Sequence, residues 1–98
     1  MRPVTHGDIA AAARVVLGAP ESERLHVIQA MLHEADSAEH YRRLWSKVHP
    51  GLGNGTLMSA ALRHNPGPEP LAGDLDYLRA MLMVIEALLD WHAASRGT

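Results

Sequence analysis

The chain contains no cysteine. This absence excludes disulfide bonds, thiolate zinc sites and cysteine nucleophiles, and it fits the reducing environment of a cytoplasm. The sequence also starts without the basic segment and apolar run of a secretory signal peptide, since its first residues read MRPVTHGD. Both absences predict a cytoplasmic protein.

The sequence also lacks a large excess of positive or negative charge. The formal net charge is −2 at pH 7, so binding to nucleic acid or to an anionic lipid surface is not favoured. Protonation of the seven histidines would change this balance at acidic pH. The apolar stretch over residues 75–92 is interrupted by Asp76, Arg79, Glu86 and Asp90, so it does not predict a membrane span.

Strand-like alternation and internal repeats are both absent, whereas apolar residues recur at helical spacing. The 98 residues, 47% of them apolar and 20% charged, have the composition of one globular domain with a single core. The predicted fold class is all-α, with a single helical domain over residues 1–98. It is expected to be a small bundle or orthogonal array of four to five helices around a largely buried C-terminal helix.

The first predicted helix covers residues 6–17. Thr5 and Asp8 have the spacing of a capping box before it, and Gly18 follows where a left-handed residue often ends a helix. The run of four alanines inside this helix would let another backbone approach closely.

The second predicted helix starts at Pro20, a residue suited to the first turn. Its apolar face changes near Asp36 and Ser37, and Asp36 with Glu39 has the spacing of a new helix cap. We expect one continuous helix to Lys47, because neither glycine nor proline interrupts it.

A turn, HPGLGNG, separates this helix from a short third one that Thr56 caps and that ends before Pro66. Glycines before a helix N-terminus let N–H groups converge on an anion, so Gly53, Gly55 and Thr56 are a candidate anion-binding site. The turn lacks the lysine of a Walker loop and no strand precedes it. The favoured interpretation is therefore a tight helix-to-helix turn.

The C-terminal helix, over residues 75–92, is predicted to start at the cap Asp74, with Leu71 packed against its first turn. Its polar stripe is narrow and also contains Met83, so most of its circumference requires cover from this chain, a second copy or a partner protein. The candidate interface residues are Met81, Met83, Ile85 and Leu88.

His33, Asp36 and His40 share one helical face at spacings that a metal ion could use. That face lies away from the apolar stripe, so a solvated surface is the favoured interpretation. We expect no metal, cofactor or catalytic residue, and the sequence favours a non-enzymatic protein. A helical DNA-binding domain, with Arg63 and His64 at the end of a recognition helix, is an alternative that the acidic balance opposes.

Three segments, RPVTHGDIAAAARV, HPGLGNGTLMSAALRH and EPLAGDLDYLRAMLMVIEALL, resemble a family of short uncharacterised alphaproteobacterial proteins, a domain of unknown function. The resemblance spans nearly the whole chain. It implies a bacterial, cytoplasmic, single-domain protein and supplies no activity. The leading hypothesis is a helical module that binds itself as a homodimer or binds another protein, and the alternative is a small-ligand or anion-binding domain.

Overall fold

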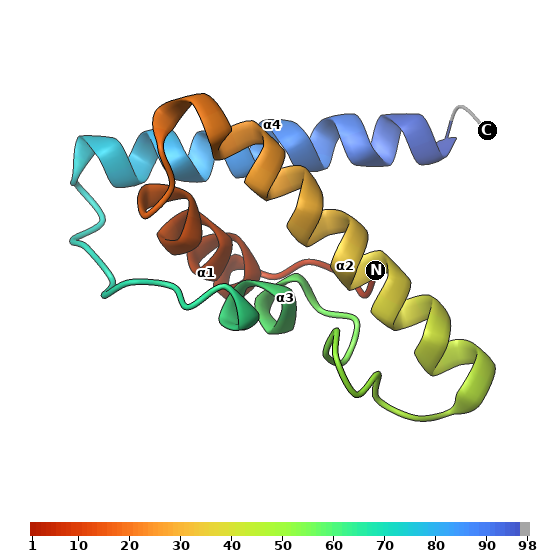
Figure 1. The fold of residues 1–98 in the computed structure, drawn as a ribbon. Coiled ribbons are helices and arrows are strands. Elements are labelled where there is room, and N and C mark those ends of the chain that lie inside the picture. Colours follow the sequence, from red (N-terminus) through yellow and green to blue (C-terminus); the bar gives the residue numbers. More distant parts are fainter. Residues whose placement is uncertain (97–98) are drawn as a thin grey trace.

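The computed structural model describes residues 1–96. They form four α-helices, α1 (His6–Leu17), α2 (Arg24–Trp45), α3 (Leu57–Arg63) and α4 (Leu75–Arg96), with one 3₁₀ turn, η1 (Glu21–Glu23), before α2 (Figure 1). No strand occurs in this described range, so the all-α prediction is confirmed. Within residues 1–96, none of the helices combines the length and apolarity that a bilayer crossing requires.

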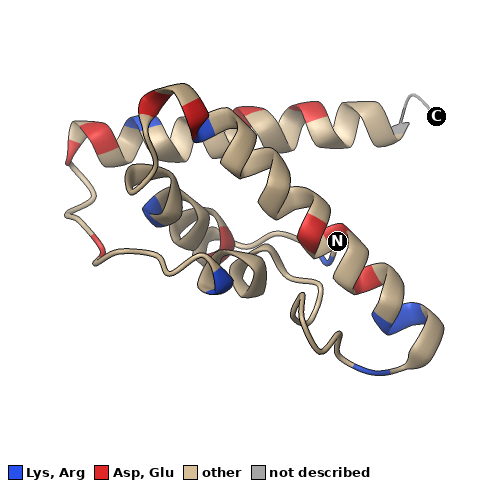
Figure 2. Ribbon diagram, viewed as in Figure 1, with Lys and Arg blue, Asp and Glu red and all other residues tan. Residues whose placement is uncertain are grey.

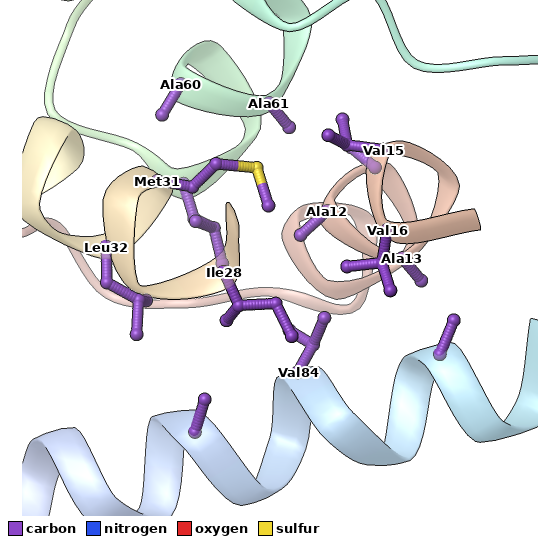
Figure 3. Close-up of a cluster of buried hydrophobic side chains, with 14 of the residues drawn as sticks. Ala12, Ala13, Val15, Val16, Ile28, Met31, Leu32, Ala60, Ala61 and Val84 are labelled. Carbon is purple, nitrogen blue, oxygen red and sulfur yellow. The ribbon is translucent and has the colours of Figure 1, made fainter. Parts of the chain in front are cut away.

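Helix α1 lies between α3 and α4 and also contacts α2 (Figure 3). Its alanines Ala11, Ala12 and Ala13 are buried, which allows the neighbouring helices to approach closely. The capping box between Thr5 and Asp8 forms as predicted. The expectation for Gly18 is wrong: its φ of −80° is right-handed, and its N–H group bonds back to the carbonyls of Val15 and Val16 in the last turn.

Helix α2 is continuous through Asp36 and Ser37, as predicted, and ends at Trp45, after which Ser46 caps it in a left-handed conformation. Its first part packs against α1 and α4, whereas its last turns extend away from α4 (Figure 1). Leu44, Trp45 and Val48 at that end are exposed. The change of apolar face therefore marks the point where α2 leaves the core.

The core combines large side chains of α2 with both small and large side chains of the other helices. Ile28, Met31 and Leu32 of α2 are each at most 1% exposed. Figure 3 shows them among Ala12 of α1, Ala60 and Ala61 of α3 and Val84 of α4. The alanines of α1 and α3 at these contacts let the helices pack closely around the larger side chains.

Helix α4 lies along one edge of the molecule (Figure 1). Asp74 caps it as predicted, with Oδ1 accepting a hydrogen bond from the Tyr77 N–H group at 3.0 Å. The predicted packing of Leu71 against its first turn is wrong, since Leu71 is 86% exposed. The expectation that α4 is largely buried is not confirmed, because the chain covers it on only one side.

Candidate functional site

Helix α4 carries two apolar faces. The inner face packs on the core through side chains that recur at helical spacing, namely Tyr77, Ala80, Val84, Ala87 and Leu88. A second set, here called the outer stripe, points away from the core and consists of Leu75, Leu78, Leu82, Ile85 and Leu89. The sequence prediction did not separate these two faces.

The outer stripe is exposed along its whole length. Its five side chains are between 41% and 67% exposed. They alternate spacings of three and four residues, which is the spacing of the a and d positions of a coiled coil. Exposed leucines are ordinary one at a time, but five in one line on a helix are typical of a surface that packs against another helix.

The predicted interface residues lie on both faces. Leu88 is 7% exposed and belongs to the core, and Met81 and Met83 are partly buried against it. Ile85 is part of the outer stripe. The interface itself stays a prediction, and its strongest candidates now include four leucines that the sequence reasoning missed. Their heptad spacing was the signal that could have identified them.

Charged side chains flank the outer stripe on one side. Arg79 and Glu86 lie one heptad apart, directly after Leu78 and Ile85 in the sequence, and both are exposed. Neither forms an ion pair with another residue of the described range. Elsewhere positive and negative charges are interspersed over the helices (Figure 2). The site is therefore an apolar strip flanked by Arg79 and Glu86, with the exposed Asp76 and Asp90 further around the helix on the same side.

The glycine-rich turn closes against α2 and α3. Gly53 and Gly55 have φ values of +91° and +93°, which favour glycine. A Cβ atom on Gly53 would lie 2.5 Å from the Ser59 Oγ, and one on Gly55 would lie 3.0 Å from the Glu39 Cα. Both glycines thus permit close packing of the turn.

A carboxylate from another helix already binds the N-terminus of α3. Asp8 of α1 accepts a hydrogen bond from the Met58 N–H group at 2.8 Å, and it is 4% exposed. The Ser59 N–H group bonds to the Thr56 hydroxyl, and the Thr56 N–H group bonds to Asn54. The N–H donors of Thr56, Met58 and Ser59 are therefore taken, and this geometry does not favour the anion-binding alternative.

Phosphate is accordingly expected to leave the melting temperature unchanged. The comparison is between millimolar phosphate and chloride at the same ionic strength, followed by circular dichroism. A ligand at 100 times its Kd stabilises by about 2.7 kcal/mol, so a bound anion would raise the melting temperature by many degrees. A phosphate-specific rise that Thr56→Ala abolished would contradict this expectation and restore the anion site.

The structure does not bring the three candidate metal ligands together. The His33 ring packs edge-on against Trp91 at 5.1 Å, and Asp36 binds the N-terminal ammonium group of Met1 at 2.7 Å. His40 is exposed on the same helix. The described residues contain no group of three or more histidine and acidic side chains that could hold a metal ion.

The basic end of α3 is tied to α2. Glu34 accepts from Arg63 at 3.3 Å and lies 2.9 Å from the His64 Nε2. A hollow of about 500 Å³ beside α1 is lined by Arg14 and His64, but Arg14 donates to the Gly67 carbonyl at 2.6 Å. These side chains hold the loop after α3 in place. Among the described residues that line the hollow, no nucleophile lies beside a general base.

Perturbed pKa values occur at the Glu39–Arg42 ion pair and at Tyr77, and both have structural causes. The hydrogen bond from Arg42 lowers the pKa of the Glu39 carboxyl, which is buried beneath the glycine-rich turn. Burial raises the pKa of the Tyr77 hydroxyl on the inner face of α4, and nearby Glu69 adds to the effect. Neither residue lies on the outer stripe.

Comparison with known proteins identifies a family for this chain. A family model described as "Domain of unknown function (DUF7742)" matches residues 2–88, which include α1 to α3 and most of α4. No curated protein and no solved structure matches the chain.

Proposed function

Because the chain belongs to the family described as "Domain of unknown function (DUF7742)", we propose its function from its surface: a non-enzymatic helical interaction module that forms a homodimer through the outer stripe of α4. The observation that carries the proposal is the line of five exposed aliphatic side chains at coiled-coil spacing. An alphaproteobacterial origin and a cytoplasmic location belong to the same proposal, and they rest on the sequence resemblance and on the lack of cysteine.

The outer stripe contributes little to the fold of one chain. Leu82 and Leu89 are 53% and 65% exposed, whereas Val84 and Leu88 on the inner face of the same helix are at most 7% exposed. Fully burying a leucine side chain is worth roughly 1.5–3 kcal/mol. Burial of five such side chains against another helix would therefore favour association strongly. A single chain does not gain this free energy.

A second copy is the partner that fits this surface most simply. Every residue of the outer stripe is leucine or isoleucine, so two identical stripes offer the aliphatic knobs and holes of a coiled-coil seam. Homodimers with two-fold symmetry are also the commonest soluble assemblies.

Leu82→Glu is expected to make the protein monomeric. Leu82 is central in the outer stripe, and a glutamate there would place a charge in the seam of each copy while remaining compatible with a helix. Sedimentation velocity over a range of concentrations measures the change, and circular dichroism should show a folded monomer with similar helix content.

Leu44→Glu is the matched control, because Leu44 is 64% exposed but lies at the far end of α2. This variant should dimerise like the unmodified protein. A wild-type chain that stays monomeric at every concentration would overturn the proposed function. Unchanged association of Leu82→Glu would place the interface away from the outer stripe.

A further inference from the structure

We infer that the two copies of α4 pack antiparallel, in the register that sets Leu82 against Ile85 of the second copy and Arg79 against Glu86 of the second copy. The inference rests on the proposed homodimer and deepens it by naming the geometry of the interface. Three properties of the described helix support it: the periodicity of the outer stripe, the position of its two flanking charges, and the burial of its other flank.

The periodicity fixes which layers can form. Leu75, Leu82 and Leu89 occupy one heptad position, and Leu78 and Ile85 occupy the other. In an antiparallel pair, each layer of the seam contains a residue of the first heptad position from one helix and a residue of the second position from the other. A two-fold axis between Met83 and Val84 therefore pairs Leu82 with Ile85 and Leu78 with Leu89. The outermost layers then pair Leu75 with His92, which is exposed at the end of the stripe.

The flanking charges select the same register. Arg79 and Glu86 are on the side of the stripe that faces away from the core, each directly after a stripe residue. Antiparallel helices bring equivalent flanking positions of the two copies together. The two-fold axis that pairs Leu82 with Ile85 also places Arg79 beside Glu86 of the second copy, and it does so twice. Two opposite charges without partners in one chain thus gain partners in the dimer.

The other flank of the stripe is apolar. It carries Met81 and Leu88, which pack partly or fully on the chain's own core. In the antiparallel register these two face each other, so no charge is buried there.

A parallel pair uses the charges less well. In a parallel coiled coil, the residue before Leu75 or Leu82 on one helix lies beside the residue after Leu78 or Ile85 on the other. Glu86 would then lie beside Met81 of the second copy, and Arg79 beside Asp74. Asp74 already caps α4 by accepting from the Tyr77 N–H group. Only the antiparallel arrangement gives both flanking charges an unengaged partner.

The seam is short, which predicts an association that depends on concentration. Helix α4 has 22 residues, or about 33 Å at 1.5 Å per residue, and stable coiled coils usually extend over three to four heptads or more. Exposed ion pairs change the affinity only modestly, and a modest change in Kd is easiest to measure when the association is weak.

Charge exchange at the two positions tests the register. In both flanking pairs, Arg79→Glu would set two carboxylates side by side, and Glu86→Arg would set two guanidinium groups side by side. Each single variant is expected to self-associate roughly tenfold more weakly at low salt. The double variant Arg79→Glu/Glu86→Arg should recover the wild-type Kd. An equimolar mixture of the two single variants should form heterodimers in preference to either homodimer, as measured by native mass spectrometry with one variant isotope-labelled.

Asp90→Arg is the control on the same helix, since it makes the same charge change as Glu86→Arg one turn further along and further around the helix from the outer stripe. It should change the Kd by much less. If wild type dimerises and Leu82→Glu disrupts the dimer, but the mixture shows no heterodimer preference, the antiparallel register is overturned and the proposed function stands. A monomeric wild type overturns both.

Discussion

Ile28→Ala is expected to lower the free energy of unfolding by roughly 2–5 kcal/mol. Ile28 is 1% exposed and points from α2 toward Val84 of α4 (Figure 3). The substitution removes most of a buried aliphatic side chain at the place where α2 meets both α1 and α4. In a domain of this size the total stability is typically about 5–15 kcal/mol, so this one change removes a large share of it.

The cost should lie in the upper part of that range because the neighbours on α1 cannot fill the space. Nearby buried residues on α1 are Ala12 and Ala13, whose methyl groups have no rotamers with which to reach into a cavity. Collapse would require whole helices to move, and the size of the residual cavity sets the penalty. Urea denaturation followed by circular dichroism measures the loss at a concentration where the protein is monomeric.

Leu25→Ala provides the comparison within the same helix. Leu25 lies one turn earlier and is 54% exposed, so its truncation should cost less than about 1 kcal/mol. Equal losses at the two positions would contradict the packing described for α2.

Local signals in the sequence were enough to place the helices. The capping residues Thr5, Thr56 and Asp74 each act on an N–H group within their own first turn, so a few consecutive residues contain the information. The same holds for the continuity of α2. The conformation of Gly18 was missed because glycine adopts left-handed and right-handed backbone about equally readily, so the residue type does not decide between them.

Tertiary contacts decided the remaining features. The nearly all-apolar circumference of α4 predicted burial on most sides, but α1 and α2 cover only its inner face and leave Leu78 and Leu82 exposed. A single helix pattern does not say which of two apolar faces meets the core. Likewise, the anion-favouring N-terminus of α3 was recognised, yet its carboxylate comes from Asp8, fifty residues earlier in the chain.

Asp8→Ala is expected to cost about 2–4 kcal/mol, because one carboxylate joins two helix N-termini. Its Oδ2 atom accepts from the Thr5 N–H group at 2.7 Å and from the Thr5 hydroxyl at 2.9 Å, which completes the cap of α1. Its Oδ1 atom accepts from the Met58 N–H group at the start of α3. Removing the carboxylate leaves several donors without a partner in a site that is 4% exposed.

Asp8→Asn separates the contribution of charge from that of shape. The asparagine amide has one acceptor oxygen, which can serve either Thr5 or Met58 but not both, so the expected loss is smaller than for alanine yet still above about 1 kcal/mol. Asp76→Ala, in the exposed first turn of α4, should cost less than about 1 kcal/mol. Hydrogen exchange distinguishes the two functions of Asp8: if it joins α1 to α3, the amides of Ala60 and Ala61 should lose protection in Asp8→Ala. Unchanged protection in α3 would limit Asp8 to capping α1.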